Sequence, residues 1–262
     1  MEQSTAPVTY SPLRPNTTLE SVSIILPTYN ERENIQRLIP ELEKTFQGYP
    51  LEILVVDDAS PDGTAAAAEA LNPVYGNIRV IRRECRAGLG SAIRRGYDEA
   101  RHDLLISCDS DGSFLPQDLL RLLKTAEQGY DLVLGSRHSP GGSYETPRWT
   151  VRLKYGISSA GNWVLRAATG LKLHDYSANC RVVRKKTWQA LHTTEQRNVF
   201  LLEMVLRAAE RGSRMTEIPV AFQDRRYGRS KLNLWVEVPK YLTVLGVQVV
   251  RYWIAVARRK DR

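Results

Sequence analysis

Short apolar runs and longer amphipathic stretches alternate along the chain from residue 22 to residue 135. The first run, VSIILP, is apolar throughout, which is typical of a strand that is buried on both faces of a sheet. The later runs are LEILVVDD, NIRVIR, DLLISCD and YDLVLG, and helical patterns separate them at residues 31–45, 64–71, 91–100 and 116–128. This alternation predicts an α/β domain with a doubly wound, mostly parallel sheet flanked by helices.

The first predicted helix follows Asn30. Glu33 stands three residues further on, which is the spacing of an N-cap and its reciprocal acceptor. We therefore expect the side chains of Asn30 and Glu33 to cap the start of this helix.

The alternation stops after Gly135, where the loop HSPGGSYETP begins. A loop of this length and composition indicates a functional lid or a binding loop more than a simple connection. Beyond it, the pattern predicts two helices, at about 151–168 and 201–211, and short strands near CRVVR and EIPVAF.

The C-terminal region mixes aromatic and aliphatic residues with Lys240 and Arg251, and ends in RRKDR. It fits an amphipathic helix at a membrane surface, and equally a helix that packs on the domain or on a second subunit. We expect a flexible tail at 1–20, one α/β domain at 21–233 and an amphipathic helical tail at 234–262.

The net charge of +8 favours anionic partners, which include nucleic acids, phospholipids and phosphorylated substrates. The three cysteines form no CxxC pair, so they indicate neither a disulfide framework nor a zinc site, and a reducing cytoplasm fits best. Residues 1–20 lack the apolar core of a secretory signal. The most apolar stretch, 241–257, is interrupted by Arg251, so we expect no membrane-spanning helix.

Acidic residues follow three of the predicted strands, in PTYNE, in VVDD and in CDSD. Ligands of doubly wound sheets bind outside the carboxyl ends of the strands, so these residues are expected to share one rim. Asp109 and Asp111 are two residues apart, and in an extended chain both would project to the same side.

Two neighbouring carboxylates suit Mg²⁺ or Mn²⁺, which completes its shell with water and phosphate oxygens such as those of a nucleoside diphosphate. Ser113 is expected to add a hydroxyl or to position a water. The alternative is that Asp109 and Asp111 only end the strand and cap the next helix. Their place in an acidic rim favours the metal site over this alternative.

We expect different roles for the acidic residues at and after the end of the second predicted strand. Asp58 is the candidate ligand for ribose or base, whereas Asp57 and Asp62 are expected to hold the turn. Cys108 lies among apolar strand residues and is expected to pack and not to act as a nucleophile.

A basic motif, DRRYGRSKLN, gathers Arg225, Arg226, Arg229 and Lys231 around Gly228. Guanidinium forks and a lysine suit a diphosphate leaving group or an acceptor phosphate, although a solvated basic loop has the same composition. The chain has no dinucleotide-binding glycine fingerprint, no phosphate-loop motif and no Gly-x-Ser-x-Gly elbow, which excludes the corresponding dehydrogenase, ATPase and hydrolase sites.

Taken in order, several motifs resemble those of the inverting family 2 glycosyltransferases with the GT-A (Rossmann-like) fold, and among them the dolichyl- or polyprenyl-phosphate mannose synthases. The resemblance runs from about residue 21 to 233. The motifs are ILPTYNERENI, VVDDASPDGT, GLGSAIRRG, the D-x-D at 109–111, GSR with Ser136 and Arg137, and RRYGRSKL.

The resemblance also implies roles for individual residues. The residues that it implies for nucleotide binding are Pro27, Tyr29, Glu31, Val56, Asp58, Asp109, Ser110 and Asp111. The residues that it implies for metal binding are Asp109, Asp111 and Ser113. The catalytic residues that it implies are Asp109, Asp111, Arg137, Arg225 and Lys231.

The chain departs from the family on the acceptor side. The usual Leu-Ser-His-Pro after the D-x-D is Gly-Ser-Phe-Leu-Pro here, and the usual D-x-x-S-G-F-R reads DYSANCR. Asn179 and Cys180 therefore replace a Gly-Phe pair, while Asp175 and Arg181 are retained. The sequence shows no membrane-spanning hairpin of the kind that some relatives carry, so it is similar to the short, peripheral members. We expect a cytoplasmic protein that lies peripherally on the cytoplasmic face of a membrane.

The function we expect is transfer of mannose from GDP-mannose to a polyprenyl or dolichyl phosphate, with inversion and with Mg²⁺ or Mn²⁺. The acceptor phosphate is already anionic, so it needs no strong general base. A family 2 enzyme that uses a UDP-sugar or a glycan acceptor is the nearest alternative. A non-enzymatic nucleotide or nucleic-acid binder fits the basic charge, but a polyanion would avoid an acidic rim, so nucleic acid is not an expected partner.

Overall fold

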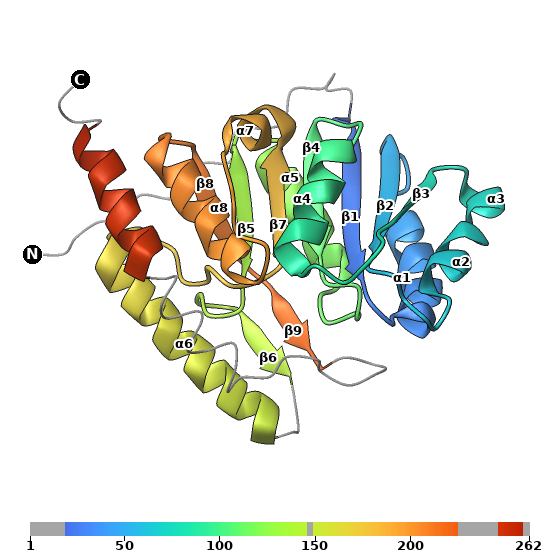
Figure 1. The fold of residues 1–262 in the computed structure, drawn as a ribbon, viewed down its shortest axis with the longest axis horizontal. Helices are drawn as coiled ribbons and strands as arrows, with labels where there is room; N and C mark the ends of the chain where they lie inside the picture. The colour runs from blue at the N-terminus through green and yellow to red at the C-terminus, as the bar shows by residue number, and fades with distance from the viewer. Residues whose placement is uncertain (1–18, 146–148, 225–245, 259–262) are drawn as a thin grey trace, which may run out of the picture.

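A seven-stranded sheet forms the centre of the structure, with helices on both of its faces (Figure 1). The structure is a computed structural model, and it describes residues 19–145, 149–224 and 246–258. The strands of the main sheet are β1 (Val22–Thr28), β2 (Leu51–Asp57), β3 (Ile78–Arg82), β4 (Leu104–Cys108), β5 (Leu132–Ser136), β7 (Cys180–Arg184) and β8 (Met215–Pro219).

The described helices connect these strands. They are α1 (Arg32–Thr45), α2 (Thr64–Glu69), α3 (Asn72–Tyr75), α4 (Leu89–Glu99), α5 (Pro116–Ala126), α6 (Trp149–Thr169), α7 (Lys185–Ala190) and α8 (Val199–Glu210). All the predicted helices of the α/β repeat are present within a few residues of their expected bounds. The short helices α3 and α7 had no clear periodicity and were not predicted.

The strand order of the main sheet is β3-β2-β1-β4-β7-β5-β8. Strands β1 to β4 run parallel, and β7 runs antiparallel to both of its neighbours, β4 and β5. The carboxyl ends of β1 to β5 and β8 therefore lie at one edge of the sheet, together with the amino end of β7. The predicted doubly wound, mostly parallel sheet is confirmed.

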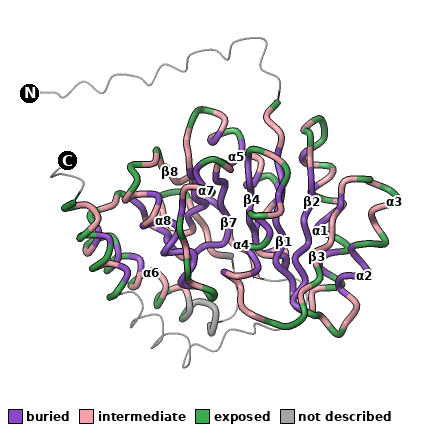
Figure 2. The backbone as a smooth tube through the Cα atoms, turned by 45° about the horizontal axis from the view of Figure 1, so that its top comes forward, coloured by how far each residue is buried: buried purple, intermediate pink, exposed green. Residues whose placement is uncertain are grey.

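Each face of the sheet carries its own apolar core. One cluster joins the sheet to α1, α2 and α5, and the other joins it to α4, α7 and α8. Figure 2 shows that the central strands are buried along their length, whereas exposed residues lie mainly on helices and loops. Burial on both faces explains why the strand segments are apolar runs without alternation.

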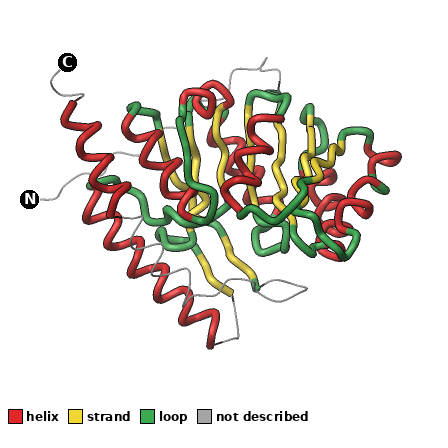
Figure 3. The backbone as a smooth tube through the Cα atoms, in the orientation of Figure 1, coloured by secondary structure: helices red, strands yellow, loops and turns green. Residues whose placement is uncertain are grey.

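Part of the predicted loop after Gly135 forms a strand. β6 (Ser143–Glu145) pairs with β9 (Ala221–Gln223) in a separate two-stranded parallel sheet beside the main one (Figure 3). The strands expected near CRVVR and EIPVAF are present, and the second segment is divided, because β8 ends at Pro219 and β9 starts after Val220. Proline has no N–H to continue a ladder, so the chain changes sheets there.

The expected cap of the first helix was also wrong. The N-cap is Glu31, without a side-chain capping bond, and Asn30 has a left-handed φ of 55°. The free N–H groups at this start are bound by the turn after β2. The N–H of Asn30 donates to Ser60 Oγ at 2.9 Å, that of Glu31 to Thr64 Oγ1 at 3.0 Å and that of Arg32 to Asp62 Oδ2 at 3.2 Å.

Residues 246–258 are helical and pack beside the end of α6. Trp253 Nε1 donates to the carbonyl of Ala168 at 2.8 Å, and Tyr252 is buried in the core cluster of α8. The rest of the predicted C-terminal helix, 234–245, lies outside the described residues. Among the helices that the structure describes, none combines the length and hydrophobicity that crossing a bilayer requires.

Two helical glycines differ in the space around them. Replacing each with alanine is therefore expected to have opposite effects on the stability of the fold. A Cβ at Gly96 of α4 would lie 2.4 Å from Ile25 Cγ2, whereas a Cβ at Gly156 of α6 meets nothing within 4 Å. We expect Gly96→Ala to destabilise the fold by about 1–3 kcal/mol through overpacking. Gly156→Ala is expected to stabilise it by about 0.5–1 kcal/mol, because alanine favours the helix.

Urea unfolding of both variants tests this pair of predictions. A stabilising Gly96→Ala would mean that α4 does not pack on β1 as closely as described.

Candidate active site at the carboxyl edge of the sheet

The turn after β2 is held by two carboxylates. Asp57 accepts hydrogen bonds from Ser60 N at 2.9 Å and Ser60 Oγ at 2.5 Å, and Thr28 Oγ1 of β1 donates to it at 3.0 Å. Asp62 Oδ1 accepts from Thr64 N at 3.0 Å and from Thr64 Oγ1 at 2.6 Å. The prediction that Asp57 and Asp62 hold this turn is confirmed.

Asp58 joins the turn after β2 to the loop after β3. Its Oδ1 accepts from Arg83 Nη1 at 2.6 Å, and the N–H groups of Ala87 and Gly88 also point to the carboxylate. Burial raises the pKa of Asp58 above its usual value, while Arg83 and these N–H groups act in the opposite direction. Its role in binding ribose or base stays a prediction.

Tyr29 lies at the end of β1 with the guanidinium of Arg86 4.6 Å from its ring centre. Arg83 and Arg86 were not singled out from the sequence. They follow a predicted strand at the same rim as the acidic clusters, so reading the residues after the third strand would have found them.

The Asp109–Asp111 segment is a turn and not an extended chain. β4 ends at Cys108, residues 110 and 111 form the turn, and Gly112 follows with a φ of 73°. The expectation that extended backbone aligns the two carboxylates was therefore wrong. Ser110 Oγ donates to the carbonyl of Pro27 at 2.9 Å, which ties the turn to β1.

Asp111 and Ser113 interact directly. Asp111 Oδ1 accepts from the backbone N–H of Ser113 at 3.1 Å and also from its hydroxyl. All three side chains of this turn, Ser110, Asp111 and Ser113, are at least nine-tenths buried. The geometry fixes the orientation of Asp111, and the hydroxyl of Ser113 is the group that holds it.

Asn179 contacts the other carboxylate of the D-x-D. Its Nδ2 donates to Asp109 Oδ1 at 3.0 Å. The sequence marked Asn179 only as a departure from the family pattern, because nothing local shows that the segment before β7 reaches the end of β4.

Arg137 and Asp175 form a buried ion pair behind this rim. Arg137 Nε donates to Asp175 Oδ2 at 2.7 Å and Nη2 donates to Oδ1 at 3.1 Å, and the Asp175 side chain is fully buried. Burial opposes the charge of Asp175, but the Arg137 guanidinium and the N–H of Ser177 outweigh it and hold the pKa of Asp175 well below its usual range. The predicted contact of Arg137 with a phosphate stays a prediction.

The retained Arg181 is buried inside the protein. Its Nη1 donates to the carbonyl of Leu201 at 2.8 Å and its Nη2 to the carbonyl of Ala178 at 2.6 Å. Burial lowers the pKa of Arg181. These contacts tie β7 to α8, so the structure gives Arg181 a structural role.

Cys108 and Cys180 face each other across β4 and β7, and both are buried. Burial raises the pKa of both thiols far above the usual value, which keeps them protonated. The prediction that Cys108 packs and is not a nucleophile is confirmed.

The remaining predicted site residues separate into three groups. The side chains of Pro27 and Val56 are buried in adjacent strands. Glu31 accepts a hydrogen bond from Asn34 Nδ2 at 2.6 Å. Arg225 and Lys231 lie outside the described residues, as do Arg226 and Arg229.

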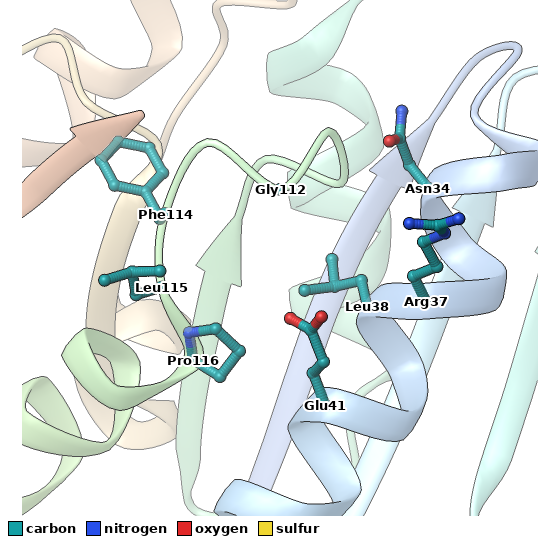
Figure 4. Close-up of a pocket in the computed structure, with 8 residues that line it drawn as sticks. All are labelled: Asn34, Arg37, Leu38, Glu41, Gly112, Phe114, Leu115 and Pro116. Atoms are coloured by element: carbon teal, nitrogen blue, oxygen red, sulfur yellow. The ribbon is translucent and has the colours of Figure 1, made fainter. Parts of the chain in front are cut away.

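A small pocket opens between α1 and the loop that follows the D-x-D turn (Figure 4). It is lined by Asn34, Arg37, Leu38, Glu41, Gly112, Phe114, Leu115 and Pro116. Its volume is about 20 Å³, which holds roughly one water molecule. The pocket is therefore too small for a nucleotide or a lipid phosphate.

The oxygen atoms of Asp109, Asp111 and Ser113 fit a hard divalent ion. Mg²⁺ needs only one or two protein carboxylates when water and phosphate oxygens supply the rest. Within residues 19–145, 149–224 and 246–258, no three His, Cys, Asp or Glu side chains are grouped to hold a metal by themselves. The donor set thus suits a metal that is bound together with a phosphorylated ligand.

The sequence pattern described as "Glycosyl transferase family 2" matches residues 23–191. The chain is 33% identical over 217 residues to polyprenol monophosphomannose synthase of Mycolicibacterium smegmatis, covering 80% of both chains. It is 37% identical over 218 residues to undecaprenyl-phosphate mannosyltransferase of Micrococcus luteus, covering 81% of this chain and 87% of that one.

The fold is similar to that of glucosyl-3-phosphoglycerate synthase from Mycobacterium tuberculosis, crystallised with Mn²⁺, UDP and glucosyl-3-phosphoglycerate. The TM-score is 0.61 at 18% identity, over 95% of this chain and 86% of that chain. This likeness supports the GT-A-like architecture.

Proposed function

The chain belongs to glycosyl transferase family 2, and from this premise we propose that it transfers mannose from GDP-mannose to a polyprenyl phosphate. The observation that carries the proposal is the identity of 33% and 37% to two polyprenyl-phosphate mannose transferases over about four fifths of the chain. The acidic rim at the carboxyl edge of the sheet supplies the chemistry that a nucleotide-sugar donor needs.

The proposed metal ligands are Asp109 and Asp111, and the ion is Mg²⁺ or Mn²⁺. When bound, the ion would neutralise charge on the departing nucleoside diphosphate. Ser113 holds the Asp111 carboxylate, and Ser110 ties the turn to β1 through the carbonyl of Pro27. These bonds fix the turn before the substrate binds, which reduces reorganisation during the reaction.

The proposed reaction is a single displacement at the anomeric carbon of the sugar. An oxygen of the acceptor phosphate forms the new bond as the bond to the nucleoside diphosphate breaks, so the configuration inverts. The phosphate is anionic at neutral pH, and catalysis then depends mainly on positioning and charge stabilisation. In this proposal Arg137, Arg225 and Lys231 contribute positive charge toward the phosphates.

An exposed apolar surface on two adjacent helices supports a membrane location. It consists of Leu153, Ile157, Trp163 and Val164 of α6 together with Val247, Val250, Trp253 and Ile254 of the helix at 246–258. In Figure 1 the helix at 246–258 lies beside the C-terminal end of α6, where Trp253 Nε1 donates to the carbonyl of Ala168. We name it the α6 apolar surface.

The occupant that we propose for the α6 apolar surface is an anionic lipid bilayer. Arg166, Arg251 and Arg258 are exposed on the same two helices, and cations near a membrane surface are attracted to anionic headgroups. A lipid-linked acceptor would be presented at such a bilayer.

The double variant Ile157→Glu/Val250→Glu is expected to lower binding to vesicles of phosphatidylcholine and phosphatidylglycerol by at least about tenfold. The reason is that burying one such side chain contributes about 1.5–3 kcal/mol, which a carboxylate removes. Co-sedimentation with the vesicles measures the effect.

Val74→Glu on α3 is the matched control, since Val74 is 73% exposed and is not part of the α6 apolar surface. Equal sedimentation of the double variant and the control would contradict the proposal. So would a wild-type dimer in gel filtration that the double variant converts to a monomer.

Sugar transfer in detergent tests the proposed reaction. Radiolabelled GDP-mannose, UDP-glucose and UDP-N-acetylglucosamine are each incubated with the full chain, polyprenyl phosphate and Mg²⁺ or Mn²⁺, with EDTA as the control. We expect metal-dependent label in the lipid from GDP-mannose. Label from a UDP-sugar would change the donor, and metal-dependent hydrolysis without labelled lipid would exclude this acceptor.

A further inference from the structure

Asn179 lies opposite Asp109 at the catalytic edge. The antiparallel ladder between β4 and β7 ends with Cys108 paired to Cys180, and one further step along both strands brings Asn179 beside Asp109. The amide Nδ2 of Asn179 donates to Asp109 Oδ1 at 3.0 Å. Asn179 is only 3% exposed, so this contact is shielded from solvent.

The chemistry of the pair fixes the orientation of the Asn179 amide. An ionised carboxylate only accepts hydrogen bonds, so the NH₂ group of Asn179 must face Asp109. The amide oxygen Oδ1 then faces away. It is buried and has no hydrogen-bond partner among the described residues.

A buried amide oxygen without a partner is costly. Folding removes its hydrogen bonds to water, and no described residue replaces them. The unpaired oxygen belongs to a residue whose other amide atom already holds a D-x-D carboxylate. The fold therefore bears this cost at a position where the NH₂ group of the same amide holds a D-x-D carboxylate.

We propose that Asn179 is a positioning residue for the metal-binding carboxylate of Asp109, which its amide NH₂ group holds in one orientation. The proposal rests on the metal site of the proposed function and deepens it.

Partners that orient a metal ligand affect affinity strongly. Their removal typically weakens metal binding by about 10–100-fold. We expect Asn179→Ala to weaken Mn²⁺ binding by a factor in this range. The measurement is a titration of the full chain with Mn²⁺, first alone and then with GDP present, in which the electron paramagnetic resonance signal of free Mn²⁺ reports the unbound ion. A titration of GDP without protein corrects for the ion that the nucleotide binds.

Asn179→Asp is a second variant that keeps the shape of the side chain. It places two carboxylates side by side, and like charges in contact destabilise the protein until a cation neutralises them. We therefore expect Mn²⁺ to raise the melting temperature of Asn179→Asp by more than that of the wild type. This readout does not depend on catalysis.

Asn72→Ala is the matched control. Asn72 Oδ1 accepts a hydrogen bond from the N–H of Ile78 at 2.9 Å, at the amino end of β3 and so at the opposite edge of the sheet. The control removes a structural amide without touching the acidic rim, and its Mn²⁺ affinity should equal that of the wild type.

The outcomes separate the two proposals. If the wild type binds Mn²⁺ and Asn179→Ala binds it equally well, Asn179 has no positioning role, although the metal site stands. The same conclusion follows if Mn²⁺ shifts the melting temperatures of Asn179→Asp and the wild type by the same amount. If the wild type binds Mn²⁺ neither alone nor with GDP present, the metal site at Asp109 and Asp111 is itself wrong.

Discussion

Replacing Asp111 with alanine is expected to lower metal-dependent sugar transfer by at least about 10²–10³-fold, the effect of removing one strong electrostatic stabiliser of a transition state. The Asp111 carboxylate is nearly buried, and the N–H and hydroxyl of Ser113 hold it in one orientation. The assay is transfer of labelled mannose to polyprenyl phosphate with Mn²⁺.

Asp111→Asn separates charge from shape. Its amide oxygen can still accept the hydrogen bonds of Ser113, but it carries no negative charge for a cation. We expect it to fold like the wild type and to be as inactive as Asp111→Ala. Glu69→Gln is the control. Glu69 lies exposed on α2, where it forms an ion pair with Arg82 of β3, and loss of this pair should leave sugar transfer unchanged. Full activity of Asp111→Asn would exclude Asp111 as a metal ligand.

Arg137→Met is expected to destabilise the fold by about 3–5 kcal/mol at neutral pH, because it leaves a buried charge on Asp175 without its partner. Asp175 is fully buried and keeps only neutral donors, which include the N–H groups of Ser177 and Ala178. Urea unfolding measures the loss. It also separates this structural effect from any contact between Arg137 and a phosphate.

The double variant Arg137→Met/Asp175→Asn is the control for this prediction. Removing both charges leaves no unpaired ion, so it should be less destabilised than the sum of the single variants. Additive losses would mean that the two side chains do not interact.

The pH dependence of this pair has a definite sign. The pKa of Asp175 is lowered in the folded protein, so the ion pair stabilises the wild type fully above the unfolded pKa of about 4, and this stabilisation is lost as the pH falls below it. In Arg137→Met the buried carboxyl favours its protonated form instead. The cost of Arg137→Met should therefore shrink as the pH is lowered from 7 toward about 3.

The fold followed from local patterns in the sequence. The apolar runs of β1, β2, β4 and β5 and the amphipathic segments between them predicted a doubly wound sheet, because strand burial and helix periodicity are local properties. The acidic residues after the strands predicted one rim, since parallel strands end at the same edge. The ordered motifs indicated the family to which the chain belongs.

The contacts that tie the rim together could not be predicted in this way. The start of α1 is capped by Ser60, Thr64 and Asp62 of another turn, so a capping rule read along one segment failed. Asp58 is paired with Arg83, and the D-x-D forms a turn that Ser110 ties to Pro27. Each of these contacts joins segments that are far apart in the chain.

The sequence by itself determined the class of fold, the acidic composition of the rim and the family. The tertiary structure decided which partner each charged group has. β7 runs antiparallel between β4 and β5, and this direction brings its preceding residues to the edge where the parallel strands end. Asp175 thereby meets Arg137 and Asn179 meets Asp109, because strand pairing depends on contacts distant in sequence and not on the pattern within any one segment.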